Sequence, residues 1–283
     1  MTATRRNSVP LVRQSKRSQG SEPMVMVTAY DEPSARFVSE AGADMILVGD
    51  SVGNTVLGFS DTLHVTVEMM EHHIAAVARA NPDVLIVGDL PWMSYHVSSG
   101  QAVESAARLV RAGAQAVKLE GGVNRVDAIA AIVNAEIPVM GHLGLTPQSV
   151  NAMGGYKVQG KSIEAAEALR QGAQAIEEAG CFAFVVEGVP DELGAMVTSE
   201  RAIPTIGIGA GPDTDGQVLV FHDLLGLGKS KPAKFVRQYG TIGVAITAAI
   251  AAFNADVRQG SFPGKAESYG TTQELSEHLN TQK

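Results

Sequence analysis

The sequence predicts a (β/α)8 barrel, and three observations predict it. Eight short apolar runs alternate with helical stretches, and three of these runs end in an acidic residue soon after an Ala-Gly pair. The alternation spans about 230 residues, close to the usual size of such a barrel. Near-continuous apolar runs are typical of parallel strands that are covered on both faces. A doubly wound open sheet is the alternative, because periodicity does not show closure.

The expected elements follow one another regularly along the chain. A helix that starts at the N-cap residue Thr66 is expected to end before Asn81-Pro82. Further helices are expected over 102–110, 126–133 and 163–176. The expected strands are 24–30, 43–50, 83–89, 116–120, 137–142, 182–187, 203–209 and, more weakly, 218–223.

Composition narrows the class of protein. The chain has 283 residues, a single cysteine and a formal net charge of -8. A chain of this length buries enough surface to fold without disulfide bonds, and one cysteine cannot form an internal bridge, so we expect a cytoplasmic protein. No apolar stretch is long enough to cross a membrane. The acidic balance argues against general nucleic-acid binding. A soluble enzyme that acts on small molecules is expected.

The two ends of the chain differ from its middle. Residues 1–20 are basic and rich in serine, with no apolar period, which predicts a disordered tail; an organelle transit peptide is the alternative. A single barrel domain is expected over 21–270. The polar residues 271–283 are expected to fray.

Two aspartates stand where barrel enzymes build their sites. Asp50 and Asp89 each follow a glycine at the end of an apolar run. Two such carboxylates would repel each other unless one took up a proton or a cation lay between them. Oxygen ligands with room for water favour Mg²⁺ over Zn²⁺. The alternative is that either aspartate caps the next helix.

Lys118 and Glu120 are two residues apart on one strand, so both should point into the barrel mouth while Val117 and Leu119 face the helices. A structural ion pair is the alternative to a functional role. Glu187 ends another apolar run, where an apolar setting suits a carboxylate to proton transfer near neutral pH. Capping of the next helix is its alternative role.

Other candidates give weaker signals. His142 is expected to be a hydrogen-bonded supporting residue, because no histidine pair has metal-ligand spacing. Cys181 is expected to be a small core residue. The glycine-rich stretch 207–211 could approach an anion, and it does not match the dinucleotide-binding pattern. The long polar stretch 146–161 is consistent with disorder or with a lid.

Together these residues indicate chemistry through an enolate. A divalent cation chelated by a 2-oxo acid would stabilise an enolate while a nearby glutamate removes the neighbouring proton. Lys118 could neutralise the substrate carboxylate. We therefore expect a reaction that forms or cleaves a carbon–carbon bond.

Several motifs follow one another in order between about residue 24 and residue 269. They are TAYD (28–31), LVGDSVGNTVLG (47–58), DLPWMSY, VKLEGG, GHLGLTPQSVN, GGYKVQGK, IPTIGIGAG and FPGKAESY. Together these motifs resemble the ketopantoate hydroxymethyltransferase family. The resemblance implies a barrel of the phosphoenolpyruvate mutase-like superfamily. It also implies transfer of a hydroxymethyl group from 5,10-methylenetetrahydrofolate to 3-methyl-2-oxobutanoate, giving 2-dehydropantoate for pantothenate and coenzyme A synthesis.

The same resemblance implies roles for individual residues. Asp50 and Asp89 would bind Mg²⁺, with Glu120 as a further ligand that can act through water. Ser51 and Lys118 would bind the oxo acid together with the two aspartates. Glu187 would be the proton acceptor. The family resemblance also implies a homo-oligomer, commonly a decamer.

Two rival functions follow from the same pattern. A metal-dependent lyase or mutase of the phosphoenolpyruvate mutase and isocitrate lyase type would share the barrel and the enolate but would not need folate. A non-catalytic binding barrel would tolerate loss of both Asp50 and Asp89, and the charged residues at the strand ends disfavour it.

Overall fold

The computed structural model describes residues 8–228 and 232–281. Its eight strands form a closed parallel barrel in the order β1 to β8, and β1 pairs with β8 through Met24 and Gly216. This confirms the predicted barrel and excludes the open sheet. The strands are β1 (Met24–Thr28), β2 (Met45–Val48), β3 (Leu85–Asp89), β4 (Ala116–Lys118), β5 (Val139–Gly144), β6 (Ala183–Glu187), β7 (Thr205–Ile208) and β8 (Gly216–Leu219).

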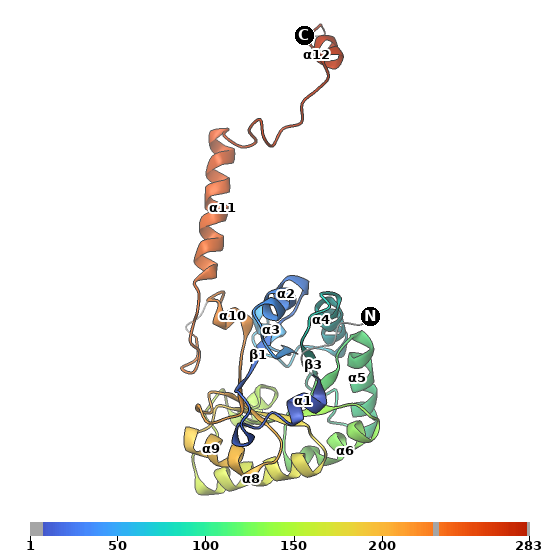
Figure 1. The fold of residues 1–283 in the computed structure, drawn as a ribbon, viewed down its shortest axis with the longest axis vertical. Coiled ribbons are helices and arrows are strands. Elements are labelled where there is room, and N and C mark those ends of the chain that lie inside the picture. Colours follow the sequence, from blue (N-terminus) through green and yellow to red (C-terminus); the bar gives the residue numbers. More distant parts are fainter. Residues whose placement is uncertain (1–7, 229–231, 282–283) are drawn as a thin grey trace. The chain divides into compact units, whose positions relative to one another are not determined.

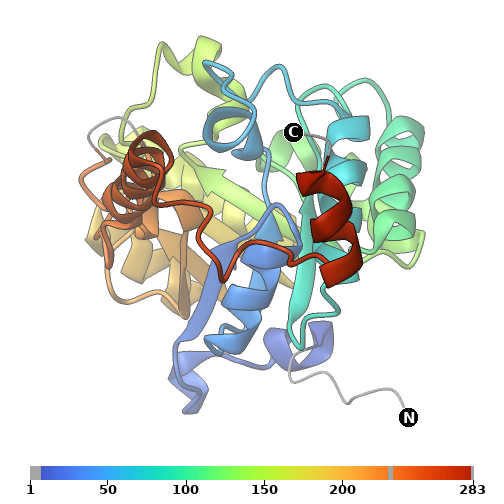
Figure 2. The ribbon, with the colours of Figure 1, turned by 90° about the horizontal axis from the view of Figure 1, so that it is seen from above.

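Helices follow most of the strands and surround the barrel (Figures 1 and 2). The cap expected at Thr66 is confirmed, because its side chain accepts a hydrogen bond from the N–H of Met69 at 3.3 Å. No helix separates β7 from β8. The helices are α1 (Val9–Arg13), α2 (Glu32–Glu40), α3 (Val52–Thr55), α4 (Val67–Arg79), α5 (Ser99–Ala112), α6 (Val126–Asn134), α7 (Val150–Met153), α8 (Ile163–Glu178), α9 (Asp191–Glu200), α10 (Phe221–Leu224), α11 (Ile242–Gln259) and α12 (Gln273–Asn280), with 3-10 turns η1 (Arg17–Gln19), η2 (Val123–Arg125) and η3 (Pro147–Ser149).

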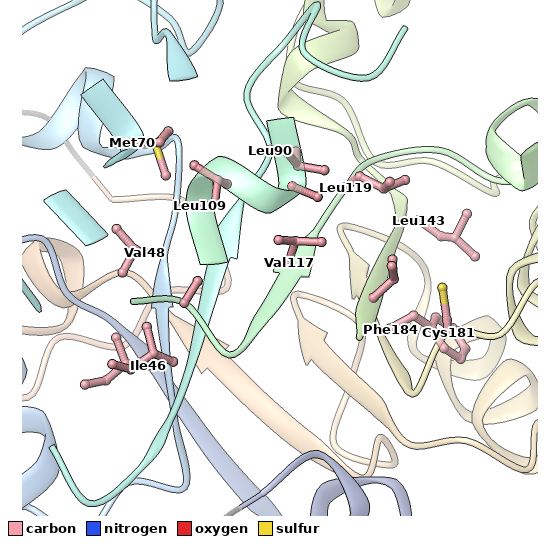
Figure 3. Close-up of a cluster of buried hydrophobic side chains, with 14 of the residues drawn as sticks. Ile46, Val48, Met70, Leu90, Leu109, Val117, Leu119, Leu143, Cys181 and Phe184 are labelled. Atoms are coloured by element: carbon pink, nitrogen blue, oxygen red, sulfur yellow. The ribbon is translucent and has the colours of Figure 1, made fainter. Parts of the chain in front are cut away.

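The alternation of side chains along each strand divides the core into two layers. In β2, Ile46 and Val48 belong to the outer layer, where they pack with helical residues such as Met70 (Figure 3). Met45 and Leu47, which alternate with them along the strand, belong to the inner layer that fills the barrel. A polar side chain at an inward position is therefore placed in the barrel interior, which explains how strand residues can form a site.

Residues 8–20 differ from the disordered tail that was expected over 1–20. α1 inserts Val12 into the inner core layer at the end of the barrel where the strands begin (Figure 2). Lys16 is buried, with its Nζ 2.9 Å from Oδ2 of Asp215. This contact joins residues 199 positions apart, so local composition could not reveal it. Residues 1–7 lie outside the described residues.

The chain divides into two units, which differ from the single domain expected over 21–270. The first unit is Met1–Leu224 with Gly228–Arg237, and the second is Leu225–Leu227 with Gln238–Lys283. The expected fraying over 271–283 is replaced by a helix at Gln273–Asn280, and residues 282 and 283 are not described. β8 lies earlier than expected, because the helix α10 takes up the second half of the expected run 218–223. Within the described residues no helix is long and apolar enough to cross a membrane.

Candidate active site

Six of the residues that form the site come from the carboxyl ends of five neighbouring strands, β2 to β6. Asp89 is the last residue of β3 and Glu187 is the last residue of β6, while His142 lies within β5. These ends form the carboxyl face of the barrel, which is the face used by barrel enzymes. Asp50, Asp89, Lys118, Glu120 and His142 are all buried, and the side chain of Glu187 is 14% exposed.

Asp50 and Asp89 lie side by side. The backbone N–H of Asp50 donates to Oδ2 of Asp89 at 3.3 Å, and Nζ of Lys118 lies 2.9 Å from Oδ1 of Asp89. Neither aspartate caps a helix, because the N-cap residues of α3 and α5 are Ser51 and Ser98. The alternative that these acids are helix caps is therefore wrong.

Burial shifts the titration of this cluster. Burial raises the pKa of Asp50 well above its ordinary value, and the charges of Asp89 and Glu120 raise it further. Burial also raises the pKa of Asp89, although the Lys118 charge opposes the shift. Burial alone would lower the pKa of Lys118, but the surrounding carboxylates outweigh it and raise the value. The cluster thus holds more negative charge than one lysine offsets.

The carboxylates suit a small hard cation. Among the described residues, no three His, Cys, Asp or Glu side chains are already grouped so that they could hold a metal ion. Mg²⁺ does not require such a cage, because it commonly binds through one or two carboxylates, retained waters and substrate oxygens. Asp50 and Asp89 fit this mode, because they lie side by side at the ends of neighbouring strands.

Both carboxylate oxygens of Glu120 have partners. Its Oε2 accepts a hydrogen bond from the backbone N–H of Gln148 at 3.0 Å, and its Oε1 lies 3.4 Å from Nδ1 of His142. These contacts hold Glu120 in place within the cluster. Its inward direction and that of Lys118 agree with the strand alternation, because Val117 and Leu119 pack in the outer layer.

His142 lies between Glu187 and the cluster formed by Asp50, Asp89, Lys118 and Glu120. Its Nδ1 lies 3.2 Å from Nζ of Lys118, and its Nε2 lies 3.2 Å from Oε2 of Glu187. Burial and the Lys118 charge lower the pKa of His142, but Glu120 and Glu187 outweigh them and raise it to about 9. Glu187 does not cap α9, which begins after Pro190 without a side-chain cap. It is free to face the site.

Ser51 stands at the edge of the cluster, directly after Asp50. Its Oγ lies 2.8 Å from the hydroxyl of Tyr30, a buried residue that follows β1. The Tyr30 backbone carbonyl in turn lies 2.7 Å from Nδ1 of His73 on α4. Ser51 is therefore oriented from β1, and its hydroxyl can still reach a small ligand.

Three of the residues that shape the site were not expected from the sequence. Gln148, Tyr95 and Tyr30 all bond to site residues that are distant along the chain. These residues lie in the motifs GHLGLTPQS, TAYD and DLPWMSY, but the spacing of residues within a motif does not show which distant residues they contact. The stretch 146–161 begins with η3 and α7, so its first part is helical and not disordered.

Two weaker expectations have different outcomes. Cys181 is buried, and burial raises the pKa of its thiol to about 12, which confirms a core residue and not a nucleophile. The glycine-rich stretch 207–211 includes the end of β7, and Gly209 and Gly211 adopt positive φ angles. An anion site there stays a prediction.

Comparisons with known proteins identify the family. The family model of ketopantoate hydroxymethyltransferase matches residues 7–265. A 3-methyl-2-oxobutanoate hydroxymethyltransferase of Koribacter versatilis (strain Ellin345) is 53% identical over 259 residues, covering 91% of this chain and 88% of the relative. The enzyme of that name from Ignicoccus hospitalis (strain KIN4/I / DSM 18386 / JCM 14125) is 55% identical over 250 residues, covering 88% of this chain and 95% of the relative.

A solved structure places the fold in a wider group. The crystal structure of 2,3-dimethylmalate lyase, a PEP mutase/isocitrate lyase superfamily member, superposes with a TM-score of 0.59 and covers 97% of each chain. At 18% identity this likeness concerns the fold alone. The family model and the close relatives carry the assignment further: the chain belongs to the ketopantoate hydroxymethyltransferase family.

Proposed function

We propose that this chain transfers a hydroxymethyl group from 5,10-methylenetetrahydrofolate to 3-methyl-2-oxobutanoate, with Mg²⁺, and so produces 2-dehydropantoate for pantothenate synthesis. The names of the close relatives support the oxo acid and the transferred group. The observation that carries the proposal is the buried cluster of Asp50, Asp89 and Lys118 beside Glu187. Such a cluster suits a small anionic oxo acid and the removal of one of its protons.

Each residue has a distinct part in this proposal. Asp50 and Asp89 would hold Mg²⁺, and Glu120 would be a further ligand. When bound, the ion acts as a Lewis acid that stabilises negative charge on the oxo group. The ammonium group of Lys118 pairs with the substrate carboxylate, and the Ser51 hydroxyl hydrogen-bonds to it. The low solvent exposure of the cluster strengthens these electrostatic contacts.

Glu187 is the proposed base. Its carboxylate removes the proton from C3 of the oxo acid, and the neighbouring imidazole of His142 holds that carboxylate in place. C3 then forms a bond to the one-carbon unit, which folate delivers as an iminium ion or as formaldehyde. One water is consumed overall and supplies the hydroxyl oxygen, while tetrahydrofolate leaves.

Turnover of the proposed substrates tests the assignment. The purified chain should form 2-dehydropantoate from 3-methyl-2-oxobutanoate only when methylenetetrahydrofolate is supplied, and a chelator should abolish the reaction until Mg²⁺ is restored. Mass spectrometry of the product is the measurement. A lyase of the superfamily type would instead cleave a substrate without folate, so folate-independent cleavage would contradict the proposal.

Exchange at C3 tests the base by itself. Glu187→Gln should reduce exchange of the C3 proton into D₂O by roughly 100- to 10,000-fold, the usual contribution of a general base. Binding of the oxo acid should change little, because Lys118 remains. The exchange is followed by proton NMR. Glu192→Gln, which alters an exposed glutamate on α9, is the matched control and should exchange normally. Wild-type exchange in Glu187→Gln would remove Glu187 from the role.

A further inference from the structure

Gln148 lies at the centre of the hydrogen bonds behind the carboxylate cluster. It belongs to η3, which follows β5, and it is buried. Its side-chain Nε2 donates to Oδ2 of Asp50 at 2.9 Å and to the backbone carbonyl of Leu90 at 3.0 Å. Its backbone N–H donates to Oε2 of Glu120 at 3.0 Å. One residue therefore contacts two of the three acids in the cluster.

Tyr95 fixes the orientation of the Gln148 amide. The Tyr95 hydroxyl accepts a hydrogen bond from the backbone N–H of Glu120 at 3.1 Å. Its single proton is therefore available to Oε1 of Gln148, which lies 2.6 Å away and much nearer than the Glu120 carbonyl at 3.4 Å. With Oε1 assigned as the acceptor, the two amide protons must face Asp50 and Leu90.

This arrangement has a consequence for each acid. Because the amide donates to Oδ2 of Asp50, the carboxylate cannot rotate without losing a buried hydrogen bond. Because the backbone N–H donates to Oε2 of Glu120, movement of that acid would likewise break a buried hydrogen bond. Residues that orient the ligands of a metal in this way commonly govern its affinity.

We propose that Gln148 is the positioning residue of the cation site, whose side chain holds Asp50 in its binding orientation. This inference rests on the proposed function, since it concerns the cation that Asp50 and Asp89 would bind. The side chain of Gln148 then joins the stretch 146–161 to the cluster. The first turn of this stretch, η3, is part of the site and not a surface loop.

Cation binding by the whole chain tests the proposal, with Mn²⁺ as the probe. Gln148→Met keeps the length of the side chain but removes its three hydrogen bonds. We expect its dissociation constant for Mn²⁺, measured by electron paramagnetic resonance of the free ion, to rise 10- to 100-fold, the usual effect of removing such a partner. Tyr95→Phe keeps the amide but not the hydroxyl that orients it, so a smaller increase is expected.

A matched control separates positioning from general damage. Thr205→Val removes a buried hydroxyl that hydrogen-bonds to Oδ2 of Asp215 and to Oγ1 of Thr198 at the opposite end of the barrel. Both it and Gln148→Met should lower the melting temperature, but only Gln148→Met should weaken Mn²⁺ binding. An unchanged dissociation constant in Gln148→Met, or an equal increase in Thr205→Val, would overturn the inference. Failure of the wild-type chain to bind Mn²⁺ would instead contradict the proposed function as well.

Discussion

Two buried lysines show how their surroundings determine their role at the scale of single residues. Lys118 and Lys16 each lie 2.9 Å from the carboxylate of a buried aspartate. Lys16 also donates to the backbone carbonyl of Thr198, so its charge has one carboxylate partner and one carbonyl partner. Lys118 instead faces Asp89 together with the charges of Glu120 and Asp50. An excess of carboxylates around a lysine indicates a place for further positive charge, whereas a single lysine–aspartate pair gives no such indication.

Replacing each lysine with methionine should separate these roles. Loss of one partner of a buried ion pair costs about 3–5 kcal/mol, so Lys118→Met and Lys16→Met should both reduce the free energy of unfolding in urea. Only Lys118→Met should weaken binding of 3-methyl-2-oxobutanoate, by about 10- to 100-fold, because a hydrogen bond to a charged group contributes about 1.5–3 kcal/mol. Isothermal titration calorimetry with Mg²⁺ present measures the affinity for the oxo acid. Equal affinity in the two variants would refute the substrate role of Lys118.

The N-terminal segment is the element whose attachment is most specific. Asp215, which precedes β8, accepts hydrogen bonds from the backbone N–H groups of Arg17 and Thr205, both at 2.9 Å, besides its contact with Lys16. One buried carboxylate thus connects the segment after α1 to the start of β7. Without Lys16 the buried charge of Asp215 would lack its cationic partner, and without Asp215 the buried charge of Lys16 would lack its anionic partner.

A double-mutant cycle should detect this dependence. Lys16→Met and Asp215→Asn each remove one charge of the pair, and each should destabilise the barrel because the other charge stays buried. The double variant should be less destabilised than the sum of the two, with a coupling of at least about 1 kcal/mol. Urea unfolding of the four chains is the measurement. Additive effects would show that the pair does not hold the segment.

Sequence patterns predicted the elements where the information is local. Parallel strands are continuous apolar runs, so all eight were found, and Asp50, Lys118 and Glu187 were placed at strand ends because alternation and run ends are visible in the chain. Gln148 was missed because its partners Asp50 and Glu120 lie 98 and 28 residues away. The helix α1 and Lys16 were missed for the same reason: a basic, Ser-rich stretch resembles a solvated tail until its distant acid is known.

At the scale of the whole molecule, the second unit contains a helix, α11, whose apolar side chains the other residues of that unit do not cover. α11 has 18 residues, none of them buried, and its apolar side chains include Val244, Ile250, Phe253 and Val257, which are 47–71% exposed. A helix with this much exposed apolar surface is typical of a contact between protein surfaces. The family resemblance implies a homodecamer, and we propose that α11 takes part in such an assembly.

Sedimentation of the whole chain checks this expectation. The wild-type chain should sediment as a species of ten copies, and Ile250→Glu or Phe253→Glu should shift it to smaller species, because an unpaired charge in an apolar contact is costly. Gln259→Glu, which changes a polar residue of the same helix, should sediment like the wild type. The barrel in the variants should keep its Mn²⁺ affinity, since its site lies in the first unit. A monomeric wild type, or an unchanged assembly in both apolar variants, would rule out association through α11.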